Sequence, residues 1–138
     1  MTGPLNLKRH RSTPPVAEPW NDPRLDEGIR IFNEGHHWHA HECWEPLWMG
    51  LEGDDKLFLQ GLIMSAAMLH QYGRKVPKGV HNHWANVTLR LDPHRPVKWR
   101  VDVAGLLGQL CPYEEAAKAG RWDLDPGAVQ MRRSAASG

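Results

Sequence analysis

Apolar residues recur at helical spacing over most of the chain beyond residue 22. Leu25, Ile29 and Phe32 are four and three positions apart, which predicts an amphipathic helix over residues 24–35. Residues 36–51 predict a second helix. Its apolar face is formed by Ala40, Cys43, Trp44, Leu47 and Leu51. Pro46 lies inside this helix, where it removes a backbone donor at a cost of roughly 3 kcal/mol, so we expect a kink or a break near residues 42–46.

The most apolar stretch follows Gly53. Residues 54–75 are apolar around nearly the whole helix, which predicts the central and most buried helix of the fold. Residues 77–91 predict a fourth helix, stopped by the dipeptide Asp92-Pro93. In residues 95–103 apolar and polar side chains alternate, as they do in a β-strand. A single strand would have no partner to pair with, so we expect an extended connector instead. Two short helical segments are expected after it, separated by Pro112.

Together these elements predict an all-α, single-domain bundle of about five or six helices. Residues 1–22 are rich in proline and poor in large apolar groups, which predicts a mobile basic tail that is unnecessary for folding. Residues 23–120 are expected to form the bundle. Residues 121–138 are expected to be a partly frayed C-terminal tail.

The composition narrows the functional classes. With 17 basic and 16 acidic side chains the formal net charge is +1, so no nucleic-acid partner is expected. The longest apolar stretch is too short for a membrane span, and the N-terminus lacks the apolar segment of a secretory signal. The two cysteines do not suggest a disulfide framework. We therefore expect a soluble, cytoplasmic protein with free thiols.

The stretch HHWHAHECWE, residues 36–45, holds four of the nine histidines. On the second helix His37, His41 and Glu45 follow one another at i, i+4 and i+8, with Trp48 beside them. They line the border of the apolar face, where side chains are partly removed from water but can find partners. This cluster is the main candidate for chemistry.

Three interpretations of the cluster compete. His41 and Glu45 are two potential ligands of a zinc-like divalent ion in a hydrolase-like enzyme, although His37 is roughly 12 Å of helix rise from Glu45, too far to share that ion. A histidine and a carboxylate could instead exchange protons in a cleft. In the third interpretation, tryptophan N–H groups, carboxylates and histidines form a structural or partner-binding network. We favour the third.

The expected pairing of the second and third helices predicts which polar groups share a site. If the second and third helices form an antiparallel hairpin centred near residue 52, facing residues have numbers that sum to about 104. Gln60 then lies between the levels of His41 and Glu45, whereas His70 should stand apart from them. Gly61 is costly inside a helix, so we expect it to permit close approach of the second helix.

The stretches FNEGHHWHAHECWEPLW and FLQGLIMSAAMLHQYGR resemble the family called domain of unknown function 309, over roughly residues 24–110. The positions that match its motif are Gly35, Ala40, His41, Glu42, Glu45, Trp48, Gln60, Gly61 and His70. The resemblance implies a small all-α bacterial or archaeal fold and no known activity. Met64 departs from the glutamine common in the family, and the pattern does not include His36, His37, His39 or Pro46.

We therefore predict a helical bundle that acts as a binding or structural module. Its expected pocket is formed by His41, Glu42, Glu45, Trp48 and Gln60. The alternative is a metal-dependent enzyme that uses His41 and Glu45 as ligands of a zinc-like ion, and no other cofactor is expected. The tryptophan-rich edge is a candidate surface for contact with a second copy of the chain.

Overall fold

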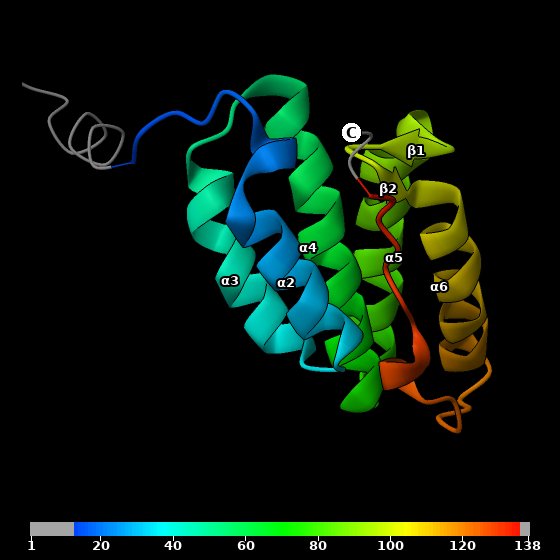
Figure 1. Ribbon diagram of the computed structural model, residues 1–138. Coiled ribbons are helices and arrows are strands. Elements are labelled where there is room, and N and C mark those ends of the chain that lie inside the picture. The colour runs from blue at the N-terminus through cyan, green and yellow to red at the C-terminus, as the bar shows by residue number, and fades with distance from the viewer. Residues whose placement is uncertain (1–12, 136–138) are drawn as a thin grey trace, which may run out of the picture.

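The computed structural model describes residues 13–135 and is all-α apart from one small hairpin (Figure 1). Its elements in chain order are η1 (Pro19–Asn21), α2 (Pro23–Asn33), α3 (His37–Met49), α4 (Gly53–Gly73), α5 (Pro77–Leu91), η2 (Asp92–His94), β1 (Val97–Lys98), β2 (Val101–Asp102), α6 (Val103–Lys118) and η3 (Pro126–Ala128). The predicted all-α bundle is confirmed.

Helix α4 is the central element, as its all-round apolar sequence predicts. It lies between α3 and α5, and α6 packs on the far side of α5 (Figure 1). Side chains on several sides of α4 are fully buried, among them Phe58, Leu59 and Met68. Because α3 and α4 are antiparallel and joined by a short connector, their polar edges lie next to each other.

The pairing of α2 with α3 depends on one buried tryptophan. Helix α2 starts at Pro23, and the Asp22 side chain caps it by accepting the Arg24 backbone N–H at 2.9 Å. Trp44 of α3 is fully buried, and its indole N–H donates to the Leu25 carbonyl at 3.2 Å. Its ring lies directly against Gly28, where any side chain would overlap it. The position of α3 is therefore fixed by Trp44.

Two helices continue through a proline, where a kink or a break was expected at Pro46 and a helix end at Pro112. Pro46 lies inside α3, and Pro112 lies inside the single helix α6 that replaces the two predicted short ones. The carbonyls that lose their donors belong to Glu42 and Gly108, four residues earlier. All four residues are exposed, so water can bond the freed carbonyls. Buried residues on the opposite faces of α3 and α6 hold the helices together.

The stretch 95–103 is not a simple extended connector. Val97 and Lys98 pair antiparallel with Asp102 and Val101, so the apparent lone strand folds back on itself. Trp99 and Arg100 form the turn with positive φ angles of 53° and 62°, which suit a tight hairpin. The prediction failed because neither residue is typical of such a turn. Burial of Trp99 against Phe58 stabilises it.

The described parts of both predicted tails pack on the bundle. Val129 and Met131 are buried, and Asn33 exchanges two hydrogen bonds with the Met131 backbone. This segment runs along the bundle beside α5 (Figure 1). Two separated apolar residues therefore anchor the segment 121–135, which was expected to be part of a partly frayed C-terminal tail.

Near the other end, Pro19 is buried and the Val16 N–H donates to the Gly50 carbonyl at 3.0 Å. Residues 13–22 of the expected mobile tail therefore contact the bundle, and whether the tail is needed for folding stays a prediction. The rest of that predicted tail, residues 1–12, lies outside the described residues.

Two other features of the described chain agree with the sequence. None of its helices is both long and apolar enough to cross a membrane. Cys43 and Cys111 are free thiols. The cytoplasmic location stays a prediction.

Gly61 permits a close helix contact, but with a different helix from the one expected. A methyl group at Gly61 would lie 2.5 Å from Leu91 Cδ2 and 2.9 Å from Arg90 Cβ, both on α5. The expected approach of α3 is therefore wrong. The error arose because sequence spacing alone did not reveal that α5 packs most tightly on this side of α4.

We expect Gly61→Ala to lower the free energy of unfolding by about 1 kcal/mol. Overpacking against α5 costs about 2 kcal/mol, and the better helix propensity of alanine offsets about half of that. Urea unfolding monitored by circular dichroism measures the change. In a Leu91→Ala background the same substitution should cost less, because only the contact with Arg90 Cβ remains. A loss of equal size in both backgrounds would contradict the proposed crowding.

Candidate functional site

Residues from α3 and α4 enclose a small pocket along the polar edge between the two helices. His41, Glu45 and Trp48 come from α3, and Gln60, Ile63 and Met64 come from α4. These six residues line a cavity of about 140 Å³, which we call the α3–α4 pocket. Gln60 shares the pocket with His41 and Glu45, as the antiparallel pairing of the two helices predicted from the sequence.

Four of the five predicted pocket residues line this cavity, and Glu42 does not. Glu42 is exposed on α3, one position after His41. One position corresponds to a rotation of 100°, which takes the Glu42 side chain away from α4 toward solvent. Ile63 and Met64 were missed, although Met64 is one turn from Gln60 on the same face of α4.

Two nitrogen atoms of the pocket residues are buried without a hydrogen-bond partner. They are His41 Nδ1 and Trp48 Nε1. Leaving a buried polar atom unpaired costs about 1–3 kcal/mol. The Lys56 ammonium lies 4.2 Å from the centre of the Trp48 ring, close enough for a cation–π contact. The pocket therefore combines unsatisfied polar atoms with a ring held in place by a cation.

Trp38 connects this pocket to His70. The Trp38 ring stacks on His41 with centroids 4.9 Å apart, and it also contacts the His70 ring at 5.2 Å. His70 does not line the pocket. This arrangement agrees with the antiparallel pairing of α3 and α4. In that pairing His70 lies opposite the start of α3, and His41 lies further along the helix.

His83 of α5 is a neighbour of the pocket that was not expected from the sequence. Burial lowers the pKa of His83, and the charge of His41 lowers it further. His83 Nδ1 is also buried without a partner. The α4–α5 connector is centred near residue 75, so facing residues sum to about 150 and His83 lies level with Ala67. That hairpin rule could have identified it.

His37, an early candidate ligand, is a buried neutral histidine. Its side chain packs edge-on against Phe32 with ring centroids 5.0 Å apart. The pKa of His37 is lowered to about 4, chiefly by burial and also by the nearby His70 and His36, while Asp125 has the opposite effect. His37 does not line the α3–α4 pocket.

A histidine–carboxylate contact outside the pocket joins α5 to α6. His81 Nδ1 is 2.8 Å from Glu114 Oε2, and the Glu114 side chain is buried while His81 is exposed. The sequence relates His81 only to His83, two positions away on the same helix. Because Glu114 is 33 residues further along the chain, no local spacing could have found this pair.

The metal interpretation lacks a third protein ligand. Over residues 13–135, no three His, Cys, Asp or Glu side chains are grouped so that they could hold one metal ion. An ion on His41 and Glu45 would therefore need its remaining ligands from water or from another molecule.

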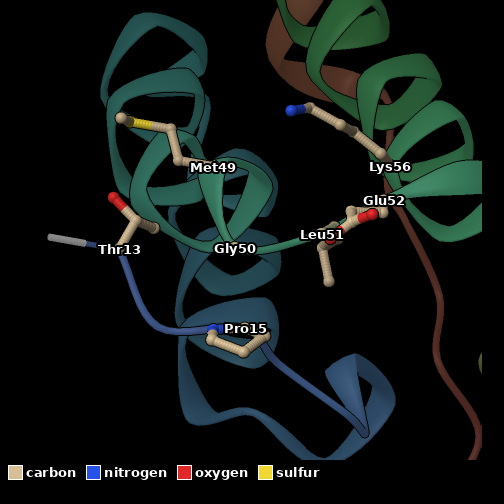
Figure 2. A pocket seen from close by; sticks show the side chains of 7 residues that line it. All are labelled: Thr13, Pro15, Met49, Gly50, Leu51, Glu52 and Lys56. Atoms are coloured by element: carbon tan, nitrogen blue, oxygen red, sulfur yellow. The ribbon is translucent and has the colours of Figure 1, made fainter. Parts of the chain in front are cut away.

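A larger cleft of about 380 Å³ lies where the N-terminal segment crosses the α3–α4 connection (Figure 2). It is lined by Thr13, Pro15, Met49, Gly50, Leu51, Glu52 and Lys56. Figure 2 shows Lys56 extending from α4 toward the end of α3. Its lining includes no histidine or cysteine, and Glu52 and Lys56 are its only ionic groups. The cleft therefore has fewer side chains that could bind a ligand or exchange a proton than the α3–α4 pocket has.

Fold and site together define a small all-α bundle with a His/Glu/Trp pocket between two antiparallel helices. Residues 25–82 match the model of the family described as Domain of unknown function (DUF309). The match contains α3, α4 and every residue of the pocket, but it ends earlier than the resemblance suggested. No curated protein and no solved structure matches the chain.

Proposed function

We propose that this protein is a binding module and that the α3–α4 pocket accepts one polar side chain of a partner. The observation that carries this proposal is the pairing of a small cavity with two unsatisfied nitrogens, His41 Nδ1 and Trp48 Nε1.

The size of the pocket favours a side chain over a metabolite. Small-molecule sites usually enclose roughly 300–1,000 Å³. The α3–α4 pocket encloses about 140 Å³. Since one water occupies about 30 Å³ in the liquid, this is room for only four or five water-sized groups. A single carboxylate, amide or imidazole group fits that volume.

The chemistry of the lining favours a group that both donates and accepts hydrogen bonds. The indole N–H of Trp48 can only donate, whereas the carboxylate of Glu45 accepts when it is ionised. Gln60 can do both. Ile63 and Met64 supply an apolar wall, which excludes water and makes each hydrogen bond electrostatically stronger.

The test uses side-chain mimics as probes: acetamide, acetate, imidazole and methylguanidinium. In ¹H–¹⁵N correlation spectra we expect at least one of them to shift the Trp48 indole signal, which Trp48→Phe identifies. Dissociation constants should lie in the millimolar range, because so few atoms contribute.

Gln60→Ala should weaken this binding by about tenfold, which corresponds to one hydrogen bond of about 1.4 kcal/mol. His39→Ala, on the exposed side of α3, is the matched control and should leave it unchanged. If no mimic moves the Trp48 signal, the proposal is wrong.

A further inference from the structure

Four residues form a continuous stripe along the α4-facing edge of α3. Trp38, His41, Glu45 and Trp48 follow one another at spacings of three, four and three. This is the spacing of residues that face a partner helix in a coiled coil. Trp38 is 47% exposed although it is a large apolar side chain, and none of the four is fully buried. We call this set the α3 stripe.

The α3 stripe is complementary to itself when two copies of α3 are antiparallel. In that arrangement facing residues have numbers that sum to 86. The two stripes therefore run in opposite directions, and the first residue of one faces the last residue of the other. His41 then faces Glu45 of the partner subunit, and Glu45 faces the partner's His41. Each Trp38 faces Trp48 of the partner subunit. Every contact occurs twice, as a two-fold symmetric interface requires.

Within one copy, His41 and Glu45 are without such partners. No ion pair or side-chain hydrogen bond joins either of them to another residue of the 13–135 range. Packed antiparallel helices lie about 8–10 Å apart, which brings facing side chains into contact. A histidine and a glutamate at that spacing can form a hydrogen bond, and an ion pair when the histidine is protonated.

Neighbouring apolar side chains extend the stripe into a surface. Leu57 of α4 is 40% exposed, one turn before the pocket residue Gln60. Met49, next to Trp48 at the end of α3, is 39% exposed. Exposed apolar groups that lie close together, bordered by polar ones, are typical of protein interaction surfaces.

We propose that the partner recognised at this site is a second copy of the same chain, docked antiparallel along the α3 stripe. The inference rests on the proposed binding function, because the stripe shares His41, Glu45 and Trp48 with the α3–α4 pocket. Helices α3 and α4 of each copy then form a four-helix interface around the two-fold axis.

Sedimentation velocity over roughly 1–100 μM tests the assembly, a range suited to an interface of modest area. We expect the full-length chain to dimerise. His41→Glu places two carboxylates opposite each other, and Glu45→His places two histidines opposite each other. Each single change should weaken dimerisation at least tenfold. The double exchange, His41→Glu with Glu45→His, should restore it to within a few-fold of the original.

Trp38→Ala provides a second variant that is safe for folding, because Trp38 is half exposed, and it should also weaken the dimer at least tenfold. Leu89→Ala removes an even more exposed apolar side chain, 63% exposed on α5, and should have no effect. Circular dichroism confirms that each variant is folded.

The outcomes separate this inference from the proposed function. A chain that is monomeric at the highest concentration, or a dimer insensitive to Trp38→Ala, overturns the inference. So does a double exchange that is no better than the single changes. If side-chain mimics still shift the Trp48 signal in those cases, the binding function stands without the dimer. If the dimer forms as proposed, Trp38→Ala should strengthen mimic binding by uncovering the pocket.

Discussion

Gly28→Ala should lower the free energy of unfolding by about 3 kcal/mol and the Tm by roughly 10 °C. A methyl group at Gly28 would lie 2.0 Å from Trp44 Nε1 and 2.4 Å from Trp44 Cδ1. Because Trp44 is fully buried, its indole ring cannot rotate away from the methyl group without displacing neighbouring side chains. The helices α2 and α3 must therefore separate, or the ring must move.

The cost has two sources and one offset. Overpacking costs about 1–3 kcal/mol, and moving the ring breaks the hydrogen bond from the Trp44 N–H to the Leu25 carbonyl, which adds about 1–3 kcal/mol. Alanine improves helix propensity by about 1 kcal/mol. Thermal and urea unfolding monitored by circular dichroism measure the net loss.

Gly108→Ala is the matched control. Gly108 also lies inside a helix, but nothing within 4 Å would contact its added methyl group. That variant should be stabilised by about 0.5–1 kcal/mol. In a Trp44→Phe background, Gly28→Ala should cost less, because the indole nitrogen is gone. Equal losses in both backgrounds would show that Trp44 is not the cause.

The second large effect concerns pH. We expect the protein to lose up to about 3 kcal/mol of stability through His37 alone as the pH falls from about 6.5 to about 4. The pKa of His37 is about 4 in the folded chain, against 6.5 for an unperturbed histidine. Burial is the largest cause of this shift, His70 and His36 add to it, and Asp125 opposes it.

The direction follows from proton uptake. Between those two pH values the unfolded chain binds a proton at His37 and the folded chain does not, so acid favours unfolding. The contribution of His37 is fully present above pH 6.5 and is lost as the pH falls through about 4. In this window the free energy of unfolding should change by about 1.4 kcal/mol per pH unit for that one proton.

Urea unfolding at several pH values measures this slope. His37→Gln should have a shallower slope than the original chain, by close to one proton. His39→Gln, which changes an exposed histidine on the same helix, serves as the control and should retain the original slope. A His37→Gln slope as steep as the original would mean that other groups cause the acid sensitivity.

The helices themselves were largely determined by local sequence. Helix α5 (Pro77–Leu91) and the central position of α4 follow from apolar periodicity and from proline and glycine stop signals, because a helix is built from contacts three and four residues apart. The pocket partners His41, Glu45 and Gln60 were also predictable, since a short connector fixes the levels of an antiparallel hairpin.

Tertiary packing decided what local sequence could not. Pro112 was expected to end a helix, but buried side chains on the inner face of α6 continue it. Gly61 permits the close approach of α5 rather than of α3. His83 lies near His41 of α3, and Glu114 contacts His81 of α5. Val129 and Met131 dock a segment that by itself resembles a tail. In each case the deciding contact joins residues far apart in the chain, and their burial outweighs the local preferences that a sequence records.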